Sequence, residues 1–312
     1  MDEEVAKWLI EGEYWMRHAF EKQLLGLPGR PAEAIREQGI AAVIKRLKDD
    51  KVGLQGLKTG QVPYTSTGNA FWDLYFLADI GLTIHDLGLE REVEEILNLQ
   101  REDGSFVFQN NMKPRYYCIS AILLSSLARM GYKNDPRLKK FVELLLKDQR
   151  LDGGWHCAMN RARGEKLEST ESCPMDNLNI LMLLGQYDKF RDDPQMNGAI
   201  DLILDHWARR AEPWRPYGFG IGTQFTKLRY PEVKYGILRV LDALSLFPHA
   251  TKNPRFQDML DNVIAKSKGG RYYAESVSRS YTDFDFGQTR TPSRWITFVV
   301  KRTQDRCMSS FR

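Results

Sequence analysis

A seven-residue segment occurs twice in this chain, and it constrains the fold more than any other feature. Residues 100–106 read QREDGSF, and residues 149–155 read QRLDGGW, forty-nine positions further along the chain. Each copy follows an apolar stretch with helical spacing. Each also contains an Asp-Gly pair, where glycine accepts the positive φ that ends a helix. A helix stop that recurs in this way indicates a repeat architecture rather than a string of unrelated helices.

Helices of two kinds alternate along the sequence. An amphipathic helix precedes each copy, and a helix that is apolar nearly all round follows it, as in YYCISAILLSSLARMGY and MDNLNILMLLGQY. A helix that is apolar on every side is buried on every side. The half-exposed kind is expected at 35–49, 86–100, 136–149, 194–210 and 254–267. The enclosed kind is expected at 68–80, 116–130, 174–187, 231–247 and 292–304, with polar loops at 56–68, 156–172 and 212–230.

Three of the half-exposed helices begin with the same signal. A capping residue followed by proline occurs in NDP (134–136), DDP (192–194) and KNP (252–254). Strand patterns are nearly absent. Because a closed ring encloses every second helix on all its faces, we predict one all-α domain over residues 1–312. Its architecture would be an α/α toroid, with about five or six helical hairpins forming two concentric rings.

The composition limits the classes of partner and the cellular compartment that the sequence predicts. Lys and Arg number 45 against 41 Asp and Glu, with no dominant basic run, so no nucleic-acid partner is predicted. No segment approaches about 18 consecutive apolar residues, so no integral membrane segment is predicted. The acidic start does not have the pattern of a signal peptide, and the four cysteines show no paired spacing. A cytoplasmic protein is expected, with its oligomeric state left open.

The two heptapeptides resemble the Gln-Trp type repeat, Q-x-x-D-G-[SG]-[FW], of squalene and oxidosqualene cyclases and of protein prenyltransferase β subunits. The alternation of half-exposed and enclosed helices also resembles that of these families, and it extends over about residues 35–305. This resemblance implies an α/α toroid that handles an isoprenoid or another apolar substrate in a central cup. Two alternatives stay open. One is a non-catalytic toroid that binds a lipid or a peptide, and the other is a carbohydrate-active toroid enzyme.

The cup of such a toroid is expected to be lined where turns enter the enclosed helices. Aromatic faces there suit an apolar chain and stabilise carbocations, and Arg or Lys suits an anionic head group. The alternative is that the aromatic residues are ordinary core and the cations are solvated. The candidate substrate-binding residues are Trp72, Arg115, Tyr116, Arg229, Tyr230, Lys234, Tyr235, Arg294 and Trp295, and Asp176 joins them as a candidate catalytic carboxylate.

A second acid hypothesis rests on Asp283 and Asp285. Class II terpene cyclases protonate an alkene with the middle Asp of D-x-D-D, and such an acid is kept protonated by burial or by a neighbouring carboxylate. The pair here forms D-x-D, but Phe286 occupies the fourth position. The alternative is a turn in which one Asp caps the last enclosed helix.

A zinc site is the third hypothesis. Prenyltransferase β subunits bind zinc through an Asp-x-Cys at such a junction and a later His. Here the comparable residues are Glu171, Ser172 and Cys173, and RYPEVKYGIL has no histidine. Two or three thiolates still suit zinc, whereas the alternative is that the thiols are free and buried. The candidate ligands are Cys118, His156, Cys157 and Cys173.

The segment RPYGFGIGTQFTKLRYP (215–231) suggests a lid. Its glycines alternate with aromatic residues, and it precedes an enclosed helix. That composition suits a loop that closes over the mouth of the cup, with a packed surface loop as the ordinary alternative.

Overall fold

The chain is helical throughout the part that the structure describes. The computed structural model describes residues 2–108, 116–155 and 171–309. These residues form seventeen α-helices and no strand, with two isolated β-bridges, so the predicted all-α class is confirmed. Within the same ranges, none of the helices has the length and apolar character needed to cross a membrane.

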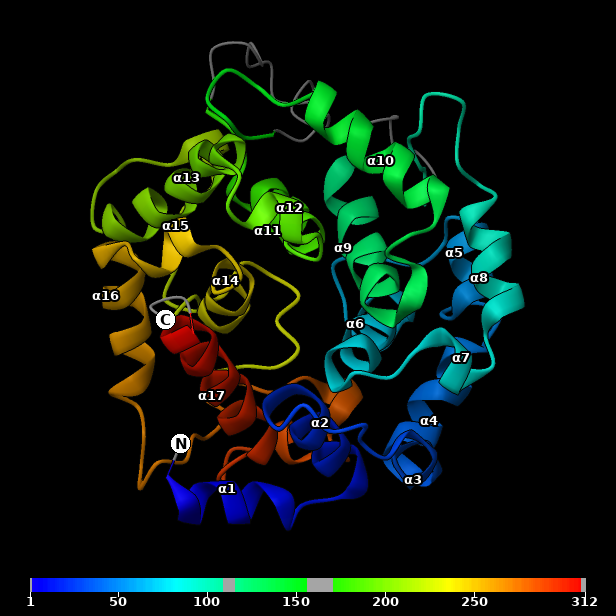
Figure 1. Ribbon diagram of the computed structural model, residues 1–312, viewed down its shortest axis with the longest axis vertical. Helices are drawn as coiled ribbons and strands as arrows, with labels where there is room; N and C mark the ends of the chain where they lie inside the picture. Colours follow the sequence, from blue (N-terminus) through cyan, green and yellow to red (C-terminus); the bar gives the residue numbers. More distant parts are fainter. Residues whose placement is uncertain (1, 109–115, 156–170, 310–312) are drawn as a thin grey trace.

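Six helices contact one another in a closed circuit. In order, α2 contacts α6, α6 contacts α9, α9 contacts α11, α11 contacts α14, α14 contacts α17, and α17 contacts α2 again. Figure 1 shows them in the middle of the molecule. Every residue of α6 and α9 is buried, as expected for enclosed helices. The six helices are α2 (Tyr14–Leu24), α6 (Ala70–Ile80), α9 (Tyr117–Leu127), α11 (Pro174–Leu184), α14 (Ile237–Leu244) and α17 (Arg294–Ser309).

Amphipathic helices lie around these six, at the periphery of the view in Figure 1. In α10, for example, Leu138, Phe141 and Leu145 are fully buried, and the opposite face is exposed. The alternation of half-exposed and enclosed helices is therefore confirmed. The peripheral helices are α1 (Glu3–Ile10), α3 (Pro31–Arg36), α4 (Gln38–Leu47), α8 (Glu90–Leu97), α10 (Pro136–Lys147), α13 (Asn197–Ala208) and α16 (Pro254–Ile264).

The three predicted caps are present. Asp135 accepts a hydrogen bond from the N–H of Arg137 at the start of α10, at 2.8 Å. Asp193 and Asn253 make the equivalent bonds before α13 and α16. Each pairs a backbone N–H that a helix start otherwise leaves without a partner.

The repeated heptapeptide joins successive peripheral helices. Gln100 Nε2 donates to the carbonyl of Gly104 in its own turn and to that of Arg137 in α10, at 3.0 and 2.7 Å. Gln149 Nε2 repeats the arrangement, donating to Gly153 and to Gln195 ahead of α13, at 2.6 and 2.8 Å. Each glutamine therefore ties one turn to the beginning of the next repeat.

The structure differs from the predicted element list in several places. Helix α2 belongs to the central circuit. Its sequence, YWMRHAFEKQL, contains too many polar residues to predict an enclosed helix. A short helix, α5 (Leu54–Lys58), overlaps the predicted loop 56–68, because Leu54 and Leu57 are buried there. The helix expected from residue 231 begins only at Ile237. Three four-residue helices, α7 (Ile84–Leu87), α12 (Asp188–Arg191) and α15 (Pro248–Thr251), lie in connections.

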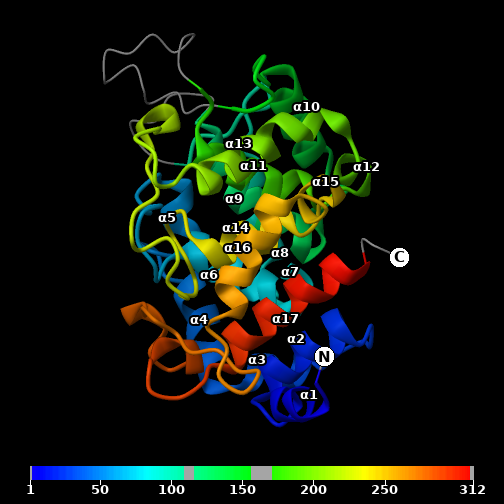
Figure 2. The same cartoon turned by 90° about the vertical axis from the view of Figure 1, so that its left-hand side faces the viewer.

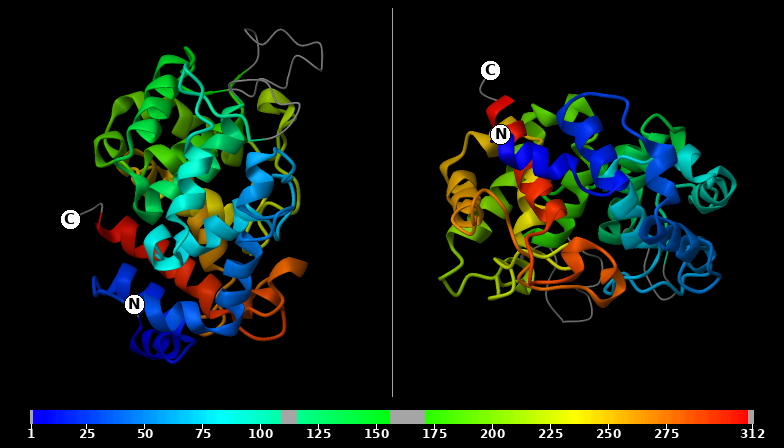
Figure 3. Two further views of the ribbon diagram at one scale, coloured as in Figure 1. Left: turned by 90° about the vertical axis from the view of Figure 1, so that its right-hand side faces the viewer. Right: turned by 90° about the horizontal axis from the view of Figure 1, so that it is seen from below.

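Figures 2 and 3 show where the connections gather. The segment between α13 and α14 and the segment between α16 and α17 both run along one side of the molecule. The two chain ends lie near each other on a different side, beside α1 and the end of α17 (Figure 3). The connections that enter α14 and α17 therefore share one face.

Candidate functional site

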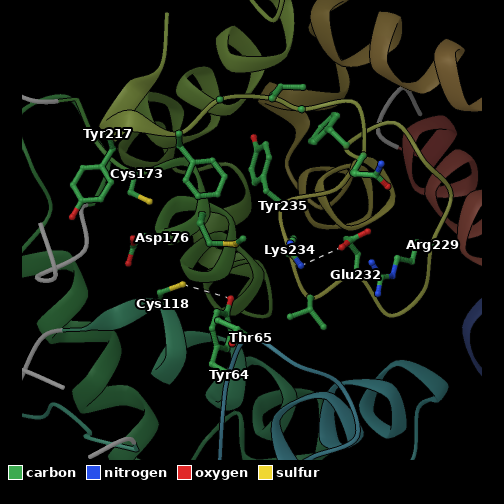
Figure 4. A pocket seen from close by; sticks show the side chains of 18 of the residues that line it. Tyr64, Thr65, Cys118, Cys173, Asp176, Tyr217, Arg229, Glu232, Lys234 and Tyr235 are labelled. Atoms are coloured by element: carbon green, nitrogen blue, oxygen red, sulfur yellow. Dashed lines mark hydrogen bonds between the residues drawn. The ribbon is translucent and has the colours of Figure 1, made fainter. Parts of the chain in front are cut away.

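A cavity of about 810 Å³ lies where four of the central helices begin. It is bounded by the segment that enters α6, the first turns of α9 and α11, and the long segment that enters α14 (Figure 4). Its volume is within the range of about 300 to 1,000 Å³ typical of small-molecule sites. The lining residues include Tyr64, Tyr116, Cys118, Cys173, Met175, Asp176, Tyr217, Phe219, Ile221, Phe225, Lys227, Arg229, Glu232, Val233, Lys234 and Tyr235.

The structure brings seven of the sequence-derived candidates together in this cavity. They come from the junctions at which turns enter α9, α11 and α14, far apart in the sequence. They are Tyr116, Cys118, Cys173, Asp176, Arg229, Lys234 and Tyr235.

Four other candidates lie outside the lining. Trp72 is fully buried and donates its Nε1–H to the Tyr64 carbonyl at 2.8 Å, so it supports the cavity floor from beneath. The Tyr230 hydroxyl donates to Asp79 at 2.9 Å, and Trp295 packs on Tyr230 with ring centroids 5.4 Å apart. Arg294 Nε donates to the carbonyl of Trp8. These residues hold the core and the N-terminal helix.

The Asp283–Asp285 pair also lies outside the lining. Asp283 is exposed. Asp285 accepts hydrogen bonds from Ser293 Oγ at 3.0 Å and from the backbone N–H groups of Arg294 and Trp295, which begin α17. Burial raises the pKa of Asp285 to about 6, although these donors favour its charged form. This geometry is that of the helix cap named above as the alternative.

Three candidates, Arg115, His156 and Cys157, lie outside the described residues. Cys118 and Cys173 are buried and line the cavity. In the described ranges, no group of three or more His, Cys, Asp or Glu side chains has an arrangement that could hold a metal ion. These residues do not form a zinc site by themselves, and the zinc hypothesis stays a prediction.

Asp176 is one of two carboxyl groups in the described lining of the cavity. It lies in the first turn of α11, is 1% exposed, and its Oδ1 has no hydrogen-bond partner among the residues that the structure describes. Burial raises its pKa to about 7, and hydrogen bonds from the Cys173 thiol and the Cys118 backbone N–H offset part of that effect. This group can therefore hold a proton near neutral pH, beside a cavity that can receive a ligand.

The two thiols are hydrogen-bonded inside the protein, because Cys118 Sγ accepts from Asn179 Nδ2 and the Cys173 thiol donates to Asp176. Burial raises the pKa of Cys173 well above its usual value, and the nearby Asp176 carboxyl acts in the same direction. Cys118 Sγ lies 3.6 Å from the hydroxyl of Tyr64 and 2.9 Å from Nδ2 of Asn179. A buried thiol that stays protonated is unreactive and can hydrogen-bond a carboxyl group.

Charged groups gather on the opposite side of the cavity from Asp176. Figure 4 shows Arg229, Glu232 and Lys234 on that side. Glu232 Oε1 accepts the backbone N–H of Lys234 at 3.2 Å. Burial raises the pKa of Glu232, although the Arg229 charge opposes the shift. Two cations therefore accompany one carboxylate on this side, which favours an anionic group, and Lys227 adds a further cation to the lining.

Several residues of the cavity were not predicted from the sequence. Tyr64 lies in the predicted polar loop 56–68, and only the three-dimensional structure shows that it is buried. Glu232 lies in the predicted enclosed helix 231–247 but was not named as a candidate. Tyr217, Phe219 and Phe225 belong to the glycine-rich segment that suggested a lid. A scan against protein-family models and a search of curated proteins both find no match to this chain.

Proposed function

We propose that this chain is a single α/α toroid of the terpenoid cyclase and prenyltransferase type. The closed circuit of α2, α6, α9, α11, α14 and α17, with amphipathic helices around it, supports this architecture. The glutamines of the two heptapeptides support it as well, because each binds the start of the next peripheral helix. The cavity then corresponds to the mouth of the central cup.

The ligand that the cavity fits best is an isoprenoid or another apolar chain with an anionic head group. This proposal rests on one observation, that the cavity lining has an aromatic side and a charged side. Aromatic and thiol side chains surround Asp176, whereas Arg229 and Lys234 gather with Glu232 on the other side, and Lys227 also lines the cavity. Arg and Lys bind carboxylates or phosphates, and aromatic faces accept an apolar or cationic chain.

Asp176 is the proposed proton donor. A cyclase that begins with protonation needs a carboxyl group that is protonated near neutral pH and faces the substrate. Asp176 has a pKa of about 7 and an unpaired Oδ1 in the cavity lining, which supports this role over Asp283 and Asp285. Protonation of a carbon–carbon double bond by Asp176 leaves a carbocation, and Tyr64, Tyr217 and Phe219 provide aromatic faces nearby.

Calorimetric titration with farnesyl diphosphate, farnesol and inorganic diphosphate tests the binding proposal. We expect farnesyl diphosphate to bind at least about tenfold more tightly than farnesol, because Arg and Lys bind its head group. The Arg229→Gln variant should lose most of that difference, and Arg91→Gln, on the exposed surface, should keep it. Equal affinities for farnesyl diphosphate and farnesol would contradict the proposal that the cavity binds an anionic head group. If neither farnesyl diphosphate nor farnesol binds, the proposed class of ligand is wrong.

Incubation of the same compounds with wild type and Asp176→Asn then separates an enzyme from a binding protein. Asn keeps the shape but cannot transfer the proton, so turnover should fall at least about a hundredfold. Binding without turnover in the wild type would favour the non-catalytic alternative.

A further inference from the structure

A buried arginine, Arg239 of α14, lies behind the charged side of the cavity. Its side chain is 2% exposed. Its Nη1 donates to the carbonyl oxygens of Glu232, Val233 and Lys234, at 3.2, 3.3 and 3.4 Å. These three residues line the cavity, whereas Arg239 is not part of the lining. Arg239 therefore holds the backbone of the charged side from behind.

The charge of Arg239 has only neutral partners. Its Nε donates to Met182 Sδ at 3.4 Å, and its Cζ lies 5.3 Å from the ring centroid of Trp72. Among the residues that the structure describes, these groups and the three carbonyls are its partners, and its Nη2 has none. An arginine side chain stays charged in proteins, and a buried charge is costly without an ion of opposite sign. The fold alone therefore leaves this charge uncompensated.

The carboxylate nearest along the helix is engaged elsewhere. Arg239, Asp242, Arg229 and Glu232 all border a small cavity of about 10 Å³, which has room for about one water molecule. Asp242 pairs with two arginines of α17, at 2.8 and 3.0 Å. Arg229 and Glu232 line the main cavity as well. The space beside Arg239 therefore adjoins the charged side of the main cavity.

The charge of Arg239 acts on groups that line the cavity. Burial raises the pKa of Glu232, and the charges of Arg229 and Arg239 oppose this rise. Burial also raises the pKa of the Tyr64 hydroxyl, and Arg239 again opposes the shift. In both cases the guanidinium favours the anionic form of a lining group. The same field favours an anionic group on a ligand.

We propose that Arg239 is a specificity-determining residue, whose charge acts from behind the lining and strengthens the preference of the cavity for an anionic head group. A buried cation without a carboxylate lowers the stability of the free protein, and an anion in the cavity compensates its charge. This inference rests on the proposed function. It adds a residue that acts through its electric field rather than through contact with the ligand.

Substitutions of Arg239 separate its charge from its hydrogen bonds. Arg239→Gln keeps an N–H donor and removes the charge, whereas Arg239→Lys keeps the charge and loses the planar guanidinium. Arg255→Gln is the control, because Arg255 pairs with Asp201 and Asp205 at the surface of α13 and is not part of the lining. If Arg239→Gln does not fold, Arg239→Met also removes the charge and provides the same test.

The ligand-free protein gives the first measurement. NMR titration of the Glu232 carboxyl carbon, assigned by the loss of its signal in Glu232→Gln, reports the local field. The carboxyl group should titrate at a higher pH in Arg239→Gln than in the wild type, because one of the charges that favour its ionised form is gone. Arg239→Lys and Arg255→Gln should titrate like the wild type. An unchanged Glu232 titration in Arg239→Gln would contradict the inference.

Calorimetric titration with farnesyl diphosphate and farnesol gives the second measurement. Arg239→Gln should bind farnesyl diphosphate at least about tenfold more weakly than the wild type and farnesol with an unchanged Kd. Arg239→Lys should restore the affinity for farnesyl diphosphate to within about threefold of the wild type. A merely structural role would weaken the binding of both compounds equally in Arg239→Gln, and that result would contradict the inference.

The inference and the proposed function fail in different ways. If the wild type binds neither compound, the proposed function is wrong and the inference falls with it. If the wild type prefers farnesyl diphosphate and Arg239→Gln keeps that preference in full, only the role of Arg239 is wrong.

Discussion

Arg302 Nη1, in the last helix, lies 2.8 Å from the carboxylate of Asp79 in α6, and 223 positions separate the two residues. Both side chains are buried. Asp79 also accepts hydrogen bonds from Arg129 at 2.6 Å and from the Tyr230 hydroxyl at 2.9 Å. Arg302 in turn lies 2.8 Å from Asp242 in α14. This ion network joins the beginning, middle and end of the central circuit.

Asp79→Asn should destabilise the fold strongly. Removing one partner of a buried ion pair leaves uncompensated charge, so we expect a loss of about 3 to 5 kcal/mol. Asp283→Asn, at an exposed site, is the matched control and should change stability by less than about 0.5 kcal/mol. Urea denaturation measures both. A loss below about 1 kcal/mol for Asp79→Asn would mean that the network does not hold the circuit together.

Asp79 should also make the stability of the fold sensitive to acid. Burial opposes ionisation of Asp79, but the charges of Arg302 and Arg129 outweigh it and hold its pKa well below the usual value. A depressed pKa stabilises the fold above the unfolded pKa of about 4, and this contribution is lost as the pH falls below that value. The wild type should therefore lose stability relative to Asp79→Asn as the pH falls from 4 toward 2. A constant difference between the two across this range would contradict the assignment.

Gln149→Met should show what the heptapeptide contributes. The substitution keeps the length of the side chain and leaves the carbonyls of Gly153 and Gln195 without their donor. We expect a loss of about 1 to 3 kcal/mol, and a similar loss for Gln100→Met. Gln61→Met, at an exposed position, is the control. Thermal unfolding that is the same for all three variants would show that the motif does not join the repeats.

The helices could be predicted from the sequence because their periodicity is strong. Leu138, Phe141 and Leu145 mark a single buried stripe, and the residues of α9 are apolar on all sides. Helix α2 was missed because Arg17 and Lys22 interrupt its apolar pattern, although Trp15 and Phe20 are buried in the core.

The cavity could be predicted only in part. The junctions before α9, α11 and α14 supply the seven sequence-derived candidates that line the cavity. Tyr64 has no local signal, because its burial depends on segments that are distant in the sequence. The choice among Asp176, Asp283 and Asp285 likewise depends on which carboxyl group faces the cavity.

Asp176 predicts a different dependence of stability on pH. Its pKa is raised to about 7 by burial, whereas in the unfolded chain the value is about 4. Between these values the folded protein holds a proton that the unfolded chain has lost. Stability should therefore fall by up to about 1.4 kcal/mol per pH unit as the pH rises from 4 to 7, and then level off.

Asp176→Asn should remove this slope, because an amide does not titrate. Urea denaturation of wild type and variant at several pH values between 4 and 9 isolates the contribution as a difference. Asp188→Asn, at an exposed site, is the control and should keep the wild-type slope. Parallel curves for wild type and Asp176→Asn would mean that this carboxyl group is ionised in the folded protein throughout.

Asp285→Ala should affect stability and leave ligand binding unchanged. Its carboxylate receives the backbone N–H groups of Arg294 and Trp295 at the start of α17, so its loss should cost about 0.5 to 2 kcal/mol. Titration with farnesyl diphosphate should give the wild-type Kd. A Kd raised tenfold at unchanged stability would return Asp285 to the ligand-binding site.

A crystal structure of the protein with farnesyl diphosphate tests the central claim most directly. We expect electron density for the isoprenoid chain of the ligand in the cavity between Tyr235 and Cys118. The diphosphate should lie against Arg229 and Lys234, and the apolar end beside Asp176. Density at another site, or a ligand reversed so that the diphosphate lies against Asp176, would contradict it.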